Sequence, residues 1–395
     1  MARHAAARPF RASVAREWTR LRADPWDLAM LTAIPLALYL LTWWILSAGV
    51  ARDLPLVVYD LDHSAMSRSL VRMLDQSPGL KVVLAASGES EAMRMIRERG
   101  AYGVVSIPAG LQADVSLGRA VKLQWAYNAQ FPSYTGSMTR DVRTVVATLS
   151  AGIELQGRAK RGMALQQARA QFEPIRTRTA TLFNDSGSYE MALALPVVFS
   201  LLHIFVTLGA VTAVGRELRA GSVPAWLAAA GGKLAPAILG KLAIAFAAFV
   251  LQAMLVAILF GAVRGWPVMG SAVAIIAGTL LLITAYLAMG LFFVAFAPSL
   301  RTALSVCAFV TAPAFAFTGQ GFPSMSMPFA ARLWAEALPL SHFTHLLNNT
   351  WLAGAPLRYS MGQLGVLLLF TLGFGALGYL RLARRVQQPE SWGQT

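Results

Sequence analysis

The sequence predicts an α-helical integral membrane protein with six transmembrane helices and an α/β extracytoplasmic domain inserted between helices 1 and 2. Only 13% of the 395 residues are charged, whereas a soluble domain carries about 25%, and the mean hydropathy is +0.54. Several uncharged runs are long enough to cross a bilayer, which takes about 20 helical residues. There are six: residues 28–51, 191–215, 242–263, 270–297, 302–318 and 359–380.

Residues 1–26 are expected to form a cytoplasmic amphipathic helix. Phe10, Val14, Trp18 and Leu21 recur at helical spacing on one face, and arginines occupy much of the rest. Such a helix lies on the membrane with its apolar side in the headgroup region. A disordered basic tail is the alternative, and it suits the first eight residues better than it suits the others.

Residues 27–51 are expected to be transmembrane helix 1. A cleaved signal peptide is the rival interpretation, because Gly49-Val50-Ala51 resembles a small-residue cleavage site. The apolar run is longer than the roughly 7–15 residues of a signal-peptide core, which favours a helix that is retained.

Residues 52–189 alternate between strand-like and helix-like patterns. The strand-like runs are residues 54–59, 80–85, 102–107, 121–127 and 175–183. The helix-like runs are residues 65–76, 89–99 and 110–117, with a longer pattern that starts near Tyr134 and weakens around Gly157. This alternation predicts an α/β domain, and the segment is long enough to bury a core of its own.

The end of the first strand carries two carboxylates, Asp60 and Asp62, followed by Ser64. A phosphoryl-transfer enzyme could use such a pair, but it also needs a lysine and further acidic residues to hold magnesium. The later strands end without such groups, and a glycosyltransferase-type Asp-x-Asp site is equally unsupported. We therefore expect Asp62 or Ser64 to cap the helix that follows, and we assign no catalytic residue.

Basic residues in the short flanks predict the orientation. Fourteen lie on the side of the two termini, against three (Arg264, Arg332 and Arg358) on the other. The positive-inside rule places both termini in the cytoplasm, with a cytoplasmic tail over 387–395. We expect the protein to span the bacterial inner (plasma) membrane. Because most of the net charge of +15 belongs to these flanks, no nucleic acid partner is implied.

Residues 190–386 hold helices 2–6, a cytoplasmic segment (215–241) and an outward segment (319–358). Within the outward segment, residues 337–357 carry too many polar groups for a span and are expected to be helical or re-entrant at the membrane surface.

Polar side chains inside the predicted membrane region need an explanation of their own. His203 and Gln252 must face protein or a cavity, with helix packing favoured over substrate contact. His342 and His345 stand at i, i+3 and could share a metal, but hydrogen bonding is the favoured interpretation. The single cysteine, Cys307, excludes a Cys-based zinc site, and no metal site is assigned.

The cytoplasmic segment mixes charges with apolar residues that look exposed, among them Val223, Trp226 and Leu227. Such a mixture is typical of a protein-docking surface. It also fits an interfacial anchor in which Trp226 sits at the headgroup level. The residues alone leave both interpretations open.

Three stretches resemble the permease subunits of ABC-2 type exporters, in the branch with a large extracytoplasmic domain after the first span. The first is Leu56-Val57-Val58-Tyr59-Asp60-Leu61-Asp62-His63-Ser64. The second is Gly215-Arg216-Glu217, Gly221-Ser222, Leu227 and Leu239-Gly240-Lys241. The third is Gly319-Gln320-Gly321-Phe322-Pro323, Met327-Pro328, Leu338-Pro339-Leu340-Ser341-His342 and Gly354. The chain departs from the family pattern at Gly215, where a second acidic residue is usual, and at Ser222, where threonine is common.

The resemblance implies which residues contact an ATPase subunit and which line the transport path. Residues implied to meet an ABC ATPase subunit are Arg216, Glu217, Arg219, Gly221, Ser222, Trp226 and Leu227. Helices 2 and 5 are implied to line the transport path, which makes Phe199, Phe205, Phe315 and Phe317 candidates, although by default they are core residues.

The chain has no G-x-x-x-x-G-K-[ST] motif, since leucine follows both Gly232-Lys233 and Gly240-Lys241. ATP and magnesium are therefore expected on a separate ATPase subunit, with no cofactor bound by this chain. Six spans make half of a two-fold transporter, so a second permease copy or a paralogue is expected. Membrane lipid is a further partner, and a periplasmic adaptor protein is an optional one.

The predicted function is that of a permease subunit which exports an apolar or amphipathic substrate, drug-like or lipid-like. One alternative is a membrane-anchored enzyme with its active site in residues 52–189. The other is a non-transporting transmitter that relays ATPase motion to a periplasmic partner.

Overall fold

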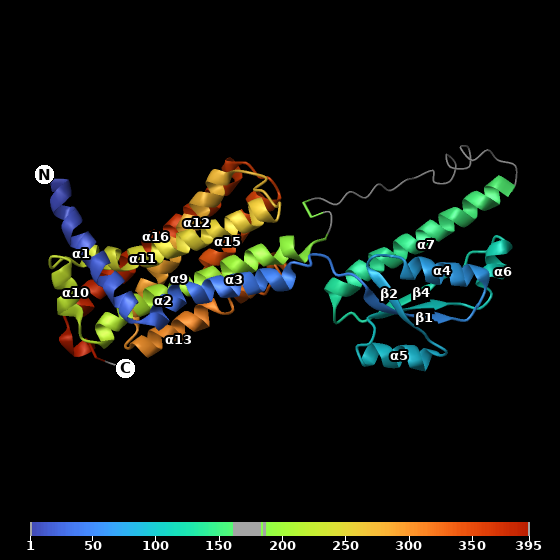
Figure 1. The fold of residues 1–395 in the computed structure, drawn as a ribbon, viewed down its shortest axis with the longest axis horizontal. Helices are drawn as coiled ribbons and strands as arrows, with labels where there is room; N and C mark the ends of the chain where they lie inside the picture. Colours follow the sequence, from blue (N-terminus) through green and yellow to red (C-terminus); the bar gives the residue numbers. More distant parts are fainter. Residues whose placement is uncertain (1, 161–182, 185–186, 394–395) are drawn as a thin grey trace. The chain divides into compact units, whose positions relative to one another are not determined.

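The structure is a computed structural model that describes residues 2–160, 183–184 and 187–393. It divides into two compact units, Met1–Gly49 with Thr181–Thr395, and Val50–Ala180. Figure 1 labels most of the helices and strands of both units. The first unit is helical and the second contains a β-sheet. The predicted strand over 175–183 falls almost entirely outside the described residues.

Among the described residues, six helical segments are long and apolar enough to cross a membrane, which confirms the predicted number of spans. They are α2 (Pro25–Leu31) with α3 (Ala33–Leu46), η1 (Glu190–Ala194) with α9 (Leu195–Arg219), α11 (Leu234–Ile258) with η2 (Leu259–Val263), α12 (Ala272–Phe296), α13 (Leu300–Thr311) with η3 (Ala314–Phe317), and α16 (Leu357–Arg385). The first span ends at Leu46, before the predicted limit at residue 51.

Helix α9 is the centre of the helical unit, since it packs against α3, α11, α12, α13 and α15 (Pro339–Leu347). It crosses α12 at very short range at Gly290, where a Cβ would lie 2.6 Å from the Ala210 Cβ and 2.8 Å from the Thr207 carbonyl oxygen. Small residues at such crossings let helix backbones approach closely in membranes.

The first span is broken between α2 and α3 for a local reason. Pro35 has no N–H to donate to the carbonyl of Leu31, four residues before it. Gln252 of α11 fills this position, because its Nε2 donates to the Leu31 oxygen at 2.8 Å. Gln252 and His203 are both buried, so the predicted protein-facing placement of these two side chains is confirmed.

Helix α1 (Ala2–Ala23) packs against α10 (Val223–Ala229) and α11. The expected apolar face is only partly left free. Phe10 and Trp18 are 38% and 41% exposed, but Leu21 is buried against the protein, so its assignment to the free face was wrong. The packed face is instead completed by Ser13 and Glu17, whose polar groups find partners on other helices.

The polar run over 337–357 is largely helical, as expected, since it forms α15 and the π-helical turn η5 (Asn348–Leu352). It is preceded by η4 (Ser324–Ser326) and α14 (Phe329–Glu336). Helix α15 is anchored by Leu340 and Phe343, which are fully buried. The N–H of Leu340 donates to the Tyr286 hydroxyl at 3.1 Å, and the Phe343 ring lies 4.8 Å from that of Phe199. A short turn, η6 (Pro389–Ser391), follows α16.

The α/β unit is built on a four-stranded sheet in the order β2-β1-β3-β4. Its strands are β1 (Leu54–Asp60), β2 (Leu80–Ala85), β3 (Gly103–Ile107) and β4 (Gln124–Tyr127). β1 pairs in parallel with β2 and β3, and β4 is antiparallel to β3. The predicted strand 121–127 is shorter than expected, because its pairing with β3 covers only the last four residues.

Each face of this sheet has its own core. The helices of the unit are α4 (Ala65–Asp75), α5 (Glu89–Arg97), α6 (Leu111–Ser116) and α7 (Pro132–Lys160). Leu56 and Val58 of β1 pack with residues of α4, α6 and α7, while Val57 packs with residues around α5. Figure 1 shows α5 on the opposite side of the sheet from α4 and α7. This is the two-residue alternation of a β-strand buried on both faces.

The two carboxylates at the end of β1 have structural roles. Asp60 Oδ1 accepts hydrogen bonds from the N–H groups of Asp62 and His63, at 3.0 and 3.2 Å. Ser64 caps α4 by accepting from the N–H of Ser67 at 3.0 Å. Asp62 had been the other candidate for this cap, but it does not cap α4. Its Oδ2 instead accepts a hydrogen bond from the N–H of Gln112, at the start of α6, at 3.2 Å.

Candidate functional site: a charged network at one end of the membrane helices

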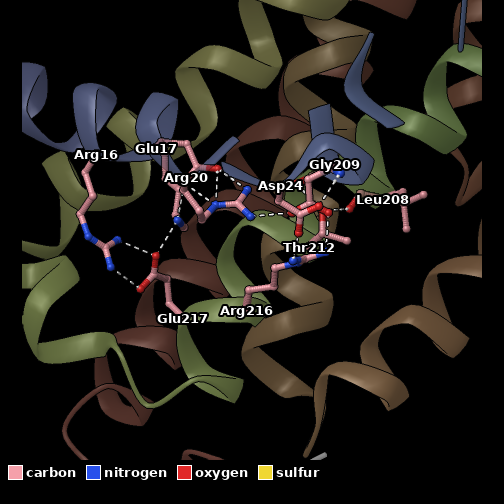
Figure 2. Close-up of polar contacts among 11 residues, drawn as sticks. Arg16, Glu17, Arg20, Asp24, Leu208, Gly209, Thr212, Arg216 and Glu217 are labelled. Atoms are coloured by element: carbon pink, nitrogen blue, oxygen red, sulfur yellow. Dashed lines mark hydrogen bonds and ion pairs between the residues drawn. The ribbon is translucent and has the colours of Figure 1, made fainter. Parts of the chain in front are cut away.

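Glu217, in the last turn of α9, is the centre of a cluster of charged side chains (Figure 2). Arg16 of α1 binds it in a bidentate manner, with N–O distances of 2.5 and 3.0 Å. Lys241 Nζ lies 2.7 Å from Glu217 Oε1, and the Ser222 hydroxyl donates to Oε2 at 2.5 Å. One carboxylate thus ties together α1, α9, the start of α10 and α11.

The cluster continues through Glu17 and Arg20 to the first membrane span. Lys241 also pairs with Glu17, which accepts from Arg20 at 2.6 Å. Arg20 reaches Asp27 of α2 at 2.5 Å. Arg216 of α9 also binds the carboxylate of Asp27, at 2.5 Å.

Arg216 makes a further ion pair with Asp24 at 2.6 Å. We call the complete set the charged network. It contains four basic and four acidic residues: Arg16, Arg20, Arg216 and Lys241, and Glu17, Asp24, Asp27 and Glu217.

The network is balanced in charge and partly buried. The side chains of Lys241, Glu17 and Glu217 are only 1%, 3% and 3% exposed, while Arg16 and Arg216 are 29% and 33% exposed. A buried ion pair contributes little net stability, but removal of one partner costs about 3–5 kcal/mol because a buried charge is left unpaired. The network therefore fixes how α1 sits on the membrane helices.

Local sequence features hold the acidic members in place. Asp24 caps α2, where its Oδ1 accepts from the N–H groups of Trp26 and Asp27 at 3.1 and 3.2 Å. These bonds, together with Arg216, lower the pKa of Asp24 below its ordinary value, the bond from Asp27 being the largest cause. Glu17 and Arg20 stand at i, i+3 on one face of α1, a spacing that brings helical side chains together.

Gly240 lets α1 approach α11. A Cβ at this position would lie 2.5 Å from the Ser13 Cβ and 3.0 Å from the Phe10 carbonyl oxygen. At the same crossing, the Ser13 hydroxyl donates to the Ala237 carbonyl at 3.0 Å. The Leu239-Gly240-Lys241 motif thus has a physical explanation, since its glycine makes the helix contact and its lysine makes the ion pairs.

Two of the apolar residues expected to be exposed on the cytoplasmic segment are buried, and for these that expectation was wrong. Val223 is fully buried, and Trp226 is 1% exposed with its Nε1 donating to the Ala237 carbonyl at 3.2 Å. Leu227 is half-buried. A short helix such as α10 cannot stand alone, so its apolar side packs against α1, α9 and α11.

The structure sorts the residues implied to meet an ATPase into two groups. Arg216 and Glu217 belong to the charged network, and Ser222 donates a hydrogen bond to Glu217. Arg219 and Gly221 are exposed, and Gly221 has φ +63°, a left-handed conformation that favours glycine.

The departure at Gly215 also has a structural reason. A Cβ at this position would lie 2.6 Å from Leu300 Cδ1, at the start of α13. The usual acidic side chain would therefore clash in this chain, unless α13 moved away.

The candidates for the transport path lie in different surroundings. Phe199 and Phe205 of α9 are buried within the helical unit, as core residues are. Phe315 and Phe317 lie in η3 and are half-buried.

Reasoning from the sequence missed most of the charged network. Arg16 and Arg20 had been counted only as evidence of orientation, Lys241 had appeared only in that count and in the Leu239-Gly240-Lys241 motif, and the three acidic residues of 1–27 had no role. The available signal was the presence of Glu17, Asp24 and Asp27 in a strongly basic segment, which calls for partners on the protein.

A second polar cluster lies at the opposite ends of these helices. Glu190 is buried and is bound by Arg264, at 2.6 and 2.8 Å, and by Trp43 Nε1 at 2.9 Å. Gln320 Nε2 donates to the Ala192 carbonyl at 2.6 Å. These contacts connect η1 with α3, with the residue after η2, and with the segment that follows α13.

In the part of the chain that the structure describes, no group of three or more His, Cys, Asp or Glu side chains that could hold a metal ion occurs. The His342 Nε2 lies 2.9 Å from the carbonyl oxygen of Glu336, as expected for a hydrogen-bonding role.

The fold and the charged network define a multi-pass helical membrane protein whose amphipathic N-terminal helix is tied to its spans. A family model described as ABC-2 family transporter protein matches residues 25–380. The match covers most of the chain, which therefore belongs to the ABC-2 transporter family, and the resemblance seen in the sequence is confirmed. No curated protein matches the chain.

Membership of this family establishes the general role. The chain is the permease of an ABC transporter and works with an ABC ATPase partner. Subunits of this family are typically the non-catalytic, transmembrane part of the complex.

Proposed function

We propose that this permease exports an apolar or amphipathic substrate, drug-like or lipid-like, across the bacterial inner membrane. The direction is inferred from the basic flanks, which favour cytoplasmic termini and an outward position for residues 52–189 and 319–358. The four candidates for the transport path, Phe199, Phe205, Phe315 and Phe317, are aromatic, which suits an apolar or amphipathic substrate.

The observation that carries the proposal is the link between a surface segment and three spans. The exposed residues around α10 form what we call the contact surface: Arg219, Gly221, Pro224, Ala225, Ala228 and Lys233. Ser222, just before α10, donates to Glu217 of the charged network, which reaches α2 and α11. Force applied by an ATPase to this surface would act on the first, second and third spans together.

In this mechanism Glu217 and Trp226 are positioning residues. Their side chains are buried, so they transmit movement of the contact surface and do not touch the ATPase themselves. ATP and magnesium are held by the ATPase subunit, and a second copy of the permease or a paralogue completes a two-fold channel. A periplasmic adaptor could join at the outward segment 319–358.

The substrate would leave through the half of the membrane where α13 gives way to η3. Phe315 and Phe317 are the better path candidates, because they remain half-exposed in a single chain. Phe199 and Phe205 would reach the path only if α9 moved, since both are packed inside the helical unit.

The contact surface is tested by reversing one exposed charge. Arg219→Glu is expected to reduce substrate-stimulated ATP hydrolysis and efflux about fivefold or more, the size expected for one important interface residue. The readouts are ATPase activity and substrate accumulation in proteoliposomes that contain the permease and its ATPase partner.

Arg384→Glu is the matched control, because Arg384 is also exposed and basic but lies in the last turn of α16. It should leave both activities unchanged. Normal transport by the Arg219→Glu variant would rule out this contact surface. ATP hydrolysis without any substrate movement in the wild-type complex would favour the non-transporting transmitter instead.

A further inference from the structure

The helical unit contains a cavity of about 260 Å³ beside the charged network, between α1, α2, α9, α11 and α13. Its lining is divided by chemistry. One part is charged and includes Arg20, Asp27 and Arg216; the other is apolar and includes Leu208 and Leu304. Figure 2 shows Leu208, Gly209 and Thr212 of α9 beside the Arg216 end of the network.

The two parts of the lining follow the depth of a membrane leaflet. Arg216 lies in the last turn of α9, and Leu208 comes eight residues earlier in the same helix, which is about 12 Å at 1.5 Å per residue. Trp26, which also lines the cavity, is 75% exposed. Tryptophan at such a position is typical of the headgroup level. The cavity therefore has its charged end at the interface and its apolar end among the acyl chains.

The wall between these two ends offers no free polar group. The hydroxyl of Thr212 already donates to the carbonyl oxygens of Leu208 and Gly209, at 2.9 and 3.2 Å. Gly209 contributes no side chain. A polar molecule would find no hydrogen-bond partner at this depth, whereas a hydrocarbon chain has no hydrogen bonds to lose.

The charged end favours an anion. Its lining has three basic residues against two acidic ones, a net charge of +1: Arg20, Arg216 and Lys241 against Glu17 and Asp27. The side chains of Arg20 and Arg216 are 23% and 33% exposed, and both line the cavity. Basic pockets between membrane helices bind anionic lipid headgroups in this way.

The volume favours part of a molecule over a whole one. Pockets that enclose a complete drug-sized ligand measure roughly 300–1,000 Å³. A cavity below that range accommodates a phosphate and the first methylenes, while longer acyl chains continue into the bilayer. The same argument makes a fully enclosed transport substrate a poor occupant.

We propose that this cavity binds an anionic phospholipid of the leaflet at the α1 end, with its phosphate at Arg20 and Arg216 and an acyl chain along Leu208 and Leu304. The bound phosphate competes with Asp27 for the two arginines, so lipid composition adjusts how firmly α1 is held to the spans. This site is independent of the direction of transport.

The test measures which lipids the purified permease retains. The full chain is reconstituted in nanodiscs of mixed phosphatidylglycerol and phosphatidylcholine, extracted into detergent, and examined by native mass spectrometry. Wild type should retain phosphatidylglycerol in preference to phosphatidylcholine. Thr212→Trp fills the cavity and should abolish this retention, whereas Leu251→Trp, at a 51% exposed position of α11 outside the cavity, should not.

A second variant keeps the test decisive if Thr212→Trp does not fold. Asp27→Asn raises the net charge of the lining by one, and should increase the preference for phosphatidylglycerol about fivefold. Equal retention of both lipids by the wild type, full retention by folded Thr212→Trp, or no gain in Asp27→Asn would each overturn the proposal. If inorganic phosphate raised the melting temperature as much as phosphatidylglycerol does, the cavity would be a site for free phosphate. That result would overturn the proposal that it binds a lipid.

Discussion

Lys241 shows how one buried cation can hold several helices together. Its amine lies between the carboxylates of Glu17 on α1 and Glu217 on α9, and it is 1% exposed. The two carboxylates would repel each other without it, although Arg20 and Arg16 each hold one of them from the other side. The lysine therefore decides whether α1 can dock against α9 and α11.

Lys241→Met is expected to destabilise the permease by about 3 kcal/mol, the low end of the range for a broken buried pair, because the two arginines still neutralise part of the charge. Thermal unfolding of the purified protein measures the loss. Adding Glu217→Gln to Lys241→Met should recover part of it, since one unpaired charge is then removed. Lys233→Met is the control at an exposed position, and a melting temperature as low as that of Lys241→Met would argue against the buried pair as the cause.

At this scale the sequence gives residue types but not partners. Arg16 and Glu217 are separated by 201 positions, and no local spacing rule connects them. The Leu239-Gly240-Lys241 motif was recognised only by its resemblance to the family, and the structure shows that Gly240 is the place where α1 approaches α11 closely.

At the scale of elements, periodic segments were predictable and short ones were not. The strand over 80–85 is confirmed at both ends, because alternating apolar residues define a half-buried strand on their own. β4 is shorter than predicted, since Val121 and Leu123 are apolar but pack against the core without pairing to β3. The burial of α10 was missed because part of its cover comes from α1, a helix distant in sequence.

The N-terminus of α6 depends on a side chain from another part of the chain. Hydrogen bonds from the Ser64 hydroxyl, and then from the N–H groups of residues 110–112, hold the pKa of Asp62 below its ordinary value. A lowered pKa means that the ionised carboxylate stabilises the folded unit above its unfolded pKa of about 3.9. That contribution is lost as the pH falls through the folded pKa.

Asp62→Ala should therefore lower the free energy of unfolding of the α/β unit by up to about 1 kcal/mol at neutral pH. The difference from wild type should shrink below about pH 4. Denaturant unfolding of the Val50–Ala180 fragment, which has its own cores, measures both values. Asp62→Asn keeps an acceptor without the charge, so it should retain most of the stability at neutral pH. A phosphatase activity abolished by either substitution would instead revive the enzyme interpretation.

At the scale of the whole molecule, the number of spans and the family match both indicate a multi-pass membrane protein. The side of the membrane on which each part lies is inferred from charge alone. Six candidate membrane helices and the family match both describe a multi-pass permease. The charged network lies at the ends of helices that carry the basic flanks, and acidic members balance much of that charge. The basic residues left without an acidic partner in the network, such as Lys233 and Arg384, still favour the same side.

Cysteine labelling tests this orientation directly. The only native cysteine, Cys307, is buried, so the wild-type protein should not react with a membrane-impermeant maleimide. Gln130→Cys, at an exposed position of the α/β unit, should react in cells whose inner membrane is intact. Lys233→Cys, on the contact surface, should react only after the inner membrane is permeabilised. The reverse pattern would place the contact surface away from cytoplasmic ATP, and no ATPase could then drive export through it.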